Sequence, residues 1–171
     1  RFKTKIFNNK YPLWLAKEPS TDEIIKAIGD PSKHKEVVFC GFGEPLIRLN
    51  EVIEVSKYLK EKYHSYIRID TDGEANLYHK KNILPQLKGL IDAISVSLNA
   101  HNADIFDQIC HSAFGKDAYP AIIEFIKEAK KYIPKVTASV VDLPIVDKEI
   151  CRGIAADLGV EFRVRPYYEE E

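Results

Sequence analysis

The segment Gly41-Phe42-Gly43-Glu44-Pro45 carries the residues best suited to hold a small polar ligand. It follows an apolar run at residues 37–40, which is typical of a buried strand. Two glycines at a strand end leave backbone N–H and C=O groups accessible, and a proline there turns the chain. Glu44 would accept a charge-assisted hydrogen bond from a ligand's ammonium group. Taken alone, the glycine pair is also typical of an ordinary turn after a strand.

Polar side chains recur near two later strand ends. Thr71 and Asp72 either bond a ligand or merely initiate a turn. Ser95, Ser97 and Asn99 alternate with apolar residues, so an extended strand would point all three to one face. A polar stripe in a sheet interior needs hydrogen-bond partners, which either a ligand or neighbouring strands would supply.

Arg163 and Arg165 share one face of the last predicted strand. Two guanidinium groups aimed into a cavity are costly unless they meet carboxylates or phosphates. The sequence leaves two explanations open with equal weight. The arginines bind an anionic ligand, or they form salt bridges to carboxylates across the sheet, at Glu44, Asp70 or Asp72.

Strand-like and helical patterns alternate along the chain, which predicts parallel β/α units. The predicted strands cover residues 36–40, 66–71, 92–98, 135–141 and 160–165. Such a repeat forms either an open doubly wound sheet or a barrel, and both place the ligand at the carboxyl ends of the strands.

The segments between these strands carry helix start and stop signals. Ser20 and Glu23 form a capping box, and Asn50, Asp117 and Asp147 are expected to precede or cap the later helices. Glycine favours the left-handed conformation that often ends a helix, so Gly159 is expected to end the last one.

Composition restricts the class of protein. A chain of 171 residues with 45% hydrophobic and 30% charged content is expected to form one soluble domain. Its net charge of −1 gives no general attraction to nucleic acid or anionic membranes, and no apolar run reaches the length of a membrane span. The three cysteines, Cys40, Cys110 and Cys151, are too scattered for a local metal site. They are expected to be buried, unpaired thiols in a reducing cytoplasm.

Four motifs together resemble the radical S-adenosylmethionine (SAM) superfamily, and within it the proteins associated with the TatD family. They are residues 38–45, 71–73, 95–100 and 162–165. The first matches that superfamily's GGEP loop except at Phe42. The superfamily's CxxxCxxC motif, which holds a 4Fe-4S cluster, is absent from these 171 residues.

The resemblance implies an α/β fold of the partial (β/α)6 TIM-like barrel type over residues 1–171. Residues 1–19 would form the loop after the cluster, 20–165 the β/α repeats and 166–171 an acidic end. The first strand and the cysteine triad would precede Arg1. The basic and aromatic opening of the chain could alternatively contact nucleic acid, although the loop is the favoured interpretation.

The resemblance also implies the function. SAM would be held by Gly41, Gly43, Glu44, Pro45, Thr71, Asp72, Ser97, Asn99 and Arg165, with Glu44 at its amino group. A cluster bound by upstream cysteines, reduced by a protein such as flavodoxin or ferredoxin, would cleave SAM to a 5′-deoxyadenosyl radical. The chain itself supplies no metal ligand and is expected to be inactive alone.

Three alternatives remain, and the substrate is not indicated by any motif. The chain could be a non-catalytic SAM- or nucleotide-binding module. It could be a partner of a TatD-family nuclease. It could also be an ordinary β/α-barrel enzyme using Glu44 and Asp72, although the sequence shows no metal or base pair for that chemistry.

Overall fold

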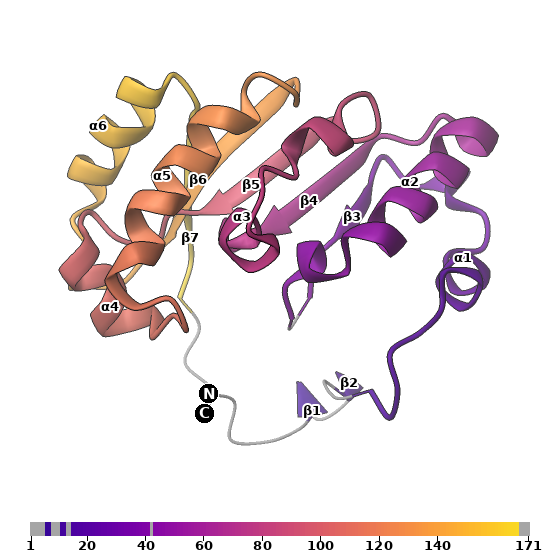
Figure 1. Cartoon of the computed structure of the whole chain (residues 1–171), viewed down its shortest axis with the longest axis horizontal. Helices are drawn as coiled ribbons and strands as arrows, with labels where there is room; N and C mark the ends of the chain where they lie inside the picture. Colours follow the sequence, from indigo (N-terminus) through magenta and orange to yellow (C-terminus); the bar gives the residue numbers. More distant parts are fainter. Residues whose placement is uncertain (1–5, 8–10, 13–14, 42, 168–171) are drawn as a thin grey trace.

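A five-stranded parallel sheet forms the centre of the protein, in the strand order β3-β4-β5-β6-β7 (Figure 1). The structure is a computed structural model that describes residues 6–7, 11–12, 15–41 and 43–167. The strands are β3 (Val37–Phe39), β4 (Ile67–Thr71), β5 (Ala93–Ser97), β6 (Lys135–Val141) and β7 (Glu161–Arg165). Their order follows the chain without reversal, and a reversal is what defines a doubly wound sheet. The sheet therefore has the arrangement of a partial β/α barrel.

Two short strands, β1 (Ile6–Phe7) and β2 (Tyr11–Pro12), pair antiparallel apart from this sheet. The rest of the predicted opening loop up to residue 14 lies outside the described residues, including Arg1, Lys3, Lys5 and Lys10. The same holds for the acidic end from residue 168 onward.

All five predicted strands are confirmed, with ends that differ by at most one residue. β5 stops at Ser97 rather than Leu98 because the chain turns there. The N–H of Leu98 donates to the carbonyl oxygen of Val96 at 3.0 Å, and Asn99 has a positive φ of 58°. Asn99 therefore follows the turn and is not a strand residue.

In the described part of the chain, six α-helices and four 3-10 helices accompany the strands. The α-helices are α1 (Thr21–Ile28), α2 (Leu49–Tyr63), α3 (Ala75–His79), α4 (Ala103–Cys110), α5 (Ala118–Ala129) and α6 (Lys148–Leu158). The 3-10 helices are η1 (Pro31–Lys33), η2 (Pro45–Arg48), η3 (Leu84–Leu87) and η4 (Gly115–Asp117).

The predicted helix ends are confirmed in part. Ser20 and Glu23 form the expected capping box of α1, and Gly159 ends α6 in the left-handed conformation. Asp117 precedes α5 without a capping bond from its side chain. The prediction for Asn50 is wrong, because η2 leads directly into α2 and the helix already begins at Leu49.

Asp147 caps α6, and its removal should lower stability. Its side-chain oxygen accepts hydrogen bonds from the backbone N–H groups of Glu149 and Ile150, both at 3.0 Å. Asp147→Ala should lower the free energy of unfolding by about 1 kcal/mol, because two helical N–H groups lose their acceptor. Urea denaturation measures this. Asp157→Ala, an exposed acid near the other end of α6, is the control, and equal losses in both variants would contradict the capping role.

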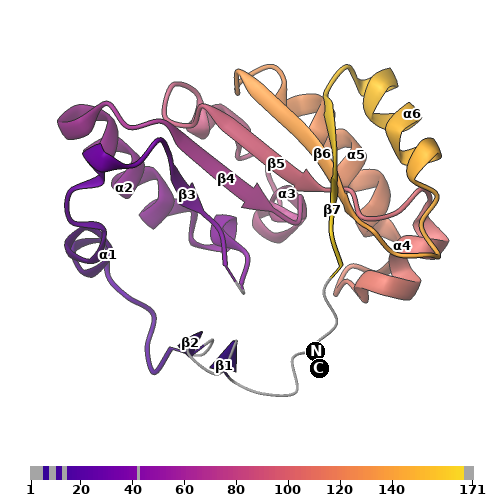
Figure 2. The ribbon, with the colours of Figure 1, turned by 180° about the vertical axis from the view of Figure 1, so that it is seen from behind.

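The helices α2, α3, α5 and α6 lie over one face of the sheet (Figure 1), and the opposite face carries none of the described helices (Figure 2). Strand residues toward the helices, such as Ile67, Ile69, Ile94 and Val96, are fully buried or nearly so. We call the opposite side the open face. Its polar strand residues are Arg68, Asp70, Ser95, Ser97, Lys135, Thr137, Ser139, Glu161, Arg163 and Arg165.

The cysteines differ in burial. Cys151 is fully buried as predicted, and Cys110 is half-buried. Cys40 is exposed, so the prediction of burial is wrong for it, because it follows the last residue of β3 at the sheet edge. Within the described residues, no helix is long and apolar enough to cross a membrane.

Candidate functional site

The predicted site residues lie at the carboxyl edge of the sheet, because parallel strands end on the same side. The glycine loop follows β3, Thr71 ends β4, Ser97 ends β5 and Arg165 ends β7. The structure divides them into two groups. One is built around the carboxylate of Glu44, and the other around the guanidinium of Arg165.

Glu44 joins the loop after β3 to the loop after β4. Its Oε1 accepts from the N–H of Leu46 at 2.9 Å and from the hydroxyl of Thr71 at 2.8 Å. Its Oε2 accepts from the N–H of Asp72 at 2.8 Å. Three of roughly four acceptor positions on the carboxylate are thus used within the chain. One position on Oε2 remains for a donor from a ligand.

The Glu44 carboxyl also has an unusual proton affinity. Burial and the nearby negative charge of Asp72 together raise its pKa to about 7, against the lowering effect of the three hydrogen bonds. Because the folded state holds this proton more tightly than the unfolded state, stability is greatest below the unfolded pKa. Stability is then lost as the pH rises from about 4.5 toward 7. An ammonium group placed beside Oε2 would favour the ionised form.

Glu44→Gln should remove this pH dependence. The wild-type free energy of unfolding should fall by on the order of 3 kcal/mol more than that of Glu44→Gln between pH 4.5 and 7, from the shift of the Glu44 pKa to about 7. Urea denaturation at a series of pH values measures the two slopes. The exposed Glu124→Gln on α5 is the control and should keep the wild-type slope. Identical slopes for Glu44→Gln and wild type would refute the assignment.

Thr71 and Asp72 form their hydrogen bonds with other residues of the chain. Thr71 is 3% exposed, and its hydroxyl donates to Glu44 and accepts from the N–H of Gly73 at 3.1 Å. It lies in register with Val96, which places its side chain toward the helices. The carboxylate of Asp72 accepts from the N–H of Glu74 at 2.9 Å. Both residues therefore hold Glu44 and the turn in place.

The glycine loop leaves space for a ligand close to its backbone. Gly41 has a φ of 138°, a conformation that residues with a Cβ rarely adopt. A Cβ added at Gly41 or at Gly43 would meet no atom of the described residues within 4 Å. Pro45 is the first residue of η2, which Glu44 caps.

Arg165 is the centre of the second group. Its Nη2 donates to the hydroxyl of Ser97 at 3.3 Å and to the side-chain oxygen of Asn99 at 3.1 Å. Its Nε is buried and has no hydrogen-bond partner among the described residues. Burial lowers the pKa of Arg165. A buried donor without an acceptor is rare in proteins, and water, an ion or a bound ligand can supply the acceptor.

Asn99 is fixed by contacts on both sides. Its backbone N–H donates to the carbonyl oxygen of Ser139 at 3.1 Å, and its side-chain nitrogen lies 3.7 Å from the sulfur of Cys110. These contacts orient the side-chain oxygen of Asn99 toward Arg165. Ser97, Asn99 and Arg165 thus converge at one place on the carboxyl edge, and their assignment to SAM stays a prediction.

Sequence reasoning did not include the neighbours Glu74, Cys110 and Ser112. The hydroxyl of Ser112 donates to Glu74 at 2.8 Å, and burial raises the pKa of both Glu74 and the Cys110 thiol. Glu74 comes directly after the motif Thr71-Asp72-Gly73 in the sequence. This position next to a predicted site motif is the signal from which Glu74 could have been predicted.

The salt bridges predicted as an alternative for the arginines are not present among the described residues. Asp70 pairs instead with Arg68, and Glu44 and Asp72 accept from backbone and hydroxyl groups. The described residues also form no metal site. No group of three His, Cys, Asp or Glu side chains in the described part could hold a metal ion. The cysteines therefore do not fit a 4Fe-4S cluster.

A parallel sheet with polar groups gathered at its carboxyl edge defines an α/β protein of the barrel type. The sequence matches the radical SAM superfamily over residues 7–155, and the chain belongs to that superfamily. No curated protein matches its sequence. The structure is similar to that of a radical SAM methyltransferase from Sphaerobacter thermophilus, with a TM-score of 0.50 and 16% sequence identity.

This structural match covers 87% of the chain and 57% of the methyltransferase. At this identity it supports the fold, which agrees with the predicted partial barrel. The TatD-associated subgroup is not tested by these matches and stays a prediction.

Proposed function

We propose that this chain binds SAM as part of a radical SAM enzyme. The observation that carries the proposal is the buried Nε of Arg165, which lacks an acceptor among the described residues of a radical SAM chain. A half-buried guanidinium at the carboxyl edge of the sheet suits the carboxylate of the methionine part of SAM. Ser97 and Asn99 hold Nη2 and so leave Nε for the ligand.

The amino group of SAM is assigned to the Glu44 side of the edge. Oε2 of Glu44 has one acceptor position left, and the loop at Gly41 and Gly43 has room beside its backbone. Thr71 and Asp72 position the carboxylate of Glu44 through their hydroxyl and N–H groups. In this proposal Pro45 fixes the loop, and the contacts to SAM come from Glu44 and the neighbouring backbone.

Bound SAM would supply the 5′-deoxyadenosyl group with which the superfamily abstracts hydrogen from substrates. The described residues contain no ligand set for a 4Fe-4S cluster. The proposal therefore assigns the cluster's cysteines to a segment outside residues 1–171, and the reductant to a protein of the flavodoxin or ferredoxin type. This chain's own residues bind and orient SAM. Three free cysteines suit a reducing cytoplasm.

Calorimetric titration of the chain with SAM tests the proposal. Saturable binding with one site per chain is expected, and L-methionine should compete because it carries the same ammonium and carboxylate groups. The absence of saturable binding at millimolar SAM would contradict the proposal. In a protein that also carries the CxxxCxxC segment, anaerobic reduction should yield 5′-deoxyadenosine. SAM binding without that product would favour the non-catalytic module.

A further inference from the structure

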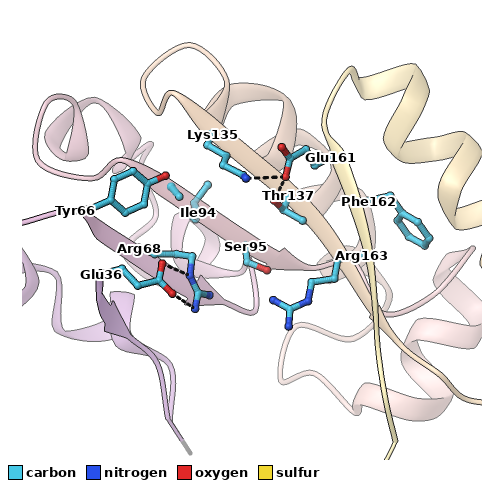
Figure 3. Close-up of a pocket in the computed structure, with 11 residues that line it drawn as sticks. Glu36, Tyr66, Arg68, Ile94, Ser95, Lys135, Thr137, Glu161, Phe162 and Arg163 are labelled. Carbon is cyan, nitrogen blue, oxygen red and sulfur yellow. Dashed lines mark hydrogen bonds and ion pairs between the residues drawn. The ribbon is translucent and has the colours of Figure 1, made fainter. Parts of the chain in front are cut away.

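A polar cavity lies on the open face of the sheet, further from the carboxyl edge than the group around Arg165. Its volume is about 410 Å³, and it lies over the first halves of β5, β6 and β7 (Figure 3). The residues that matter for its chemistry are Arg68, Ser95, Lys135, Thr137, Glu161 and Arg163. The proposed SAM site uses none of these side chains.

Two of the three cations around this cavity are neutralised by carboxylates. The carboxylate of Glu36 accepts hydrogen bonds from Nε and Nη2 of Arg68, each at 3.2 Å. Asp70 forms an ion pair with the same guanidinium. Lys135 pairs with Glu161, whose oxygen lies 3.2 Å from the lysine nitrogen. Arg68 thus has two carboxylate partners and Lys135 has one, whereas Arg163 is the cation of the cavity wall that has no carboxylate partner in the described part of the chain.

The exposed side chain of Arg163 forms no hydrogen bond or ion pair with any residue that the structure describes. Its side chain extends over the sheet toward Ser95 and Arg68 (Figure 3). Ser95 and Thr137 are neighbours in register on β5 and β6. On this wall of the cavity the hydroxyl of Thr137 donates to Glu161 at 3.3 Å, and the hydroxyl of Ser95 is left as a donor among the described residues.

The second arginine of the strand increases the need for an anion. Arg163 and Arg165 lie on the same side of β7. Burial lowers the pKa of Arg165, the negative charge of Asp70 opposes this, and the charge of Arg163 lowers the pKa further. Two like charges on one strand face destabilise the sheet unless a counter-ion lies between or beside them. Neither arginine forms a salt bridge with a carboxylate of the described residues, so both guanidinium groups remain open to an external anion.

We propose that Arg163 binds an anionic group of the substrate, a carboxylate or a phosphate, while Arg165 faces SAM. The assignment of Arg165 to SAM rests on the proposed function, whereas the anion site at Arg163 does not. Residues two apart on a strand are separated by about 7 Å, so the substrate's anion would be held that far below the SAM site. The substrate class is then a small acid or phosphate ester whose anionic group lies several bonds from the reacting carbon.

Anion titrations followed by NMR test this site on the chain as it is. Sodium phosphate and sodium succinate are titrated separately at constant ionic strength, and the backbone amides of Ser95 and Thr137 are observed. In the wild type at least one anion should shift both signals to saturation. In Arg163→Gln the affinity should fall about tenfold or more, because a charged bidentate donor is lost. The anion that saturates distinguishes a carboxylate from a phosphate ligand.

Lys127→Gln is the matched control, since it removes one positive charge from the exposed side of α5. It should bind the anion as the wild type does. Unchanged anion affinity in Arg163→Gln, or shifts that never saturate in the wild type with either anion, would overturn the proposal.

SAM titration of the same variants separates the two claims. Arg163→Gln should keep the wild-type SAM affinity within about threefold, a difference below 1 kcal/mol. A loss as large as that of Arg165→Gln would place Arg163 at SAM and overturn the division of roles. Saturable anion binding by a wild type that does not bind SAM would overturn the proposed function while leaving the anion site standing.

Discussion

Arg165→Gln should weaken SAM binding by about 10- to 100-fold, the loss that follows when a charged hydrogen-bond donor is removed from a carboxylate. In the free protein Nη2 of Arg165 already bonds Ser97 and Asn99, whereas the buried Nε has no acceptor among the described residues. The guanidinium is therefore preorganised, and binding needs little further ordering of this side chain. Glutamine keeps some polar character but supplies neither the charge nor the planar fork.

Calorimetric SAM titrations of wild type and Arg165→Gln measure this loss, with Lys127→Gln as the control for a change of net charge. Thermal unfolding without ligand should show a second effect. Removing a half-buried cation without a carboxylate partner should leave the midpoint unchanged or raise it. A large fall in the midpoint together with wild-type SAM affinity would show that Arg165 serves the fold and not the cofactor.

Much of the fold could be predicted from the sequence because its signals are local. The apolar runs before Cys40, Thr71 and Asn99 have strand length, and the helices between them begin and end at recognisable caps. Since parallel strands end at one edge, the predicted site residues could also be placed together. Asn50 was misplaced because a 3-10 helix opened by Pro45 continues directly into α2.

The division of the site into two groups could not be predicted, because it depends on contacts between distant residues. Arg165 reaches Ser97 and Asn99 across 68 and 66 residues of sequence, and Glu44 reaches Thr71 across 27. Each of these side chains had several possible partners at the strand ends. Only the register of the sheet decides that Thr71 points toward the helices while Ser97 lies on the open face.

Gly73 is the glycine at which an added methyl group is expected to lower the free energy of unfolding most. Gly73 has a φ of 83°, and a Cβ there would lie 2.7 Å from a methyl carbon of Val96 and 3.3 Å from two carbons of Ile122. Val96 and Ile122 are fully buried in β5 and α5, so neither can move away without opening the core. Gly73→Ala therefore combines backbone strain with overpacking.

We expect Gly73→Ala to lower the free energy of unfolding by about 2 to 4 kcal/mol, the sum of these two costs. Gly89→Ala is the matched control, because Gly89 has a φ of 75° but open space around its Cβ position. It should show the cost of backbone strain alone, about 1 kcal/mol. Equal losses in the two variants, measured by urea denaturation, would rule out the steric contribution.

Adding Val96→Ala to Gly73→Ala should identify the clash itself. Val96→Ala alone creates a cavity and destabilises the core, yet in the double variant it removes the atom nearest the new methyl group. The combined loss should therefore be smaller than the sum of the single losses, by about 1 kcal/mol or more. Strict additivity would mean that the strain lies in the backbone. The N–H of Gly73 donates to Thr71, which in turn donates to Glu44. Gly73→Ala should therefore also weaken the pH dependence that Glu44 confers, and relief of the clash in the double variant should restore it.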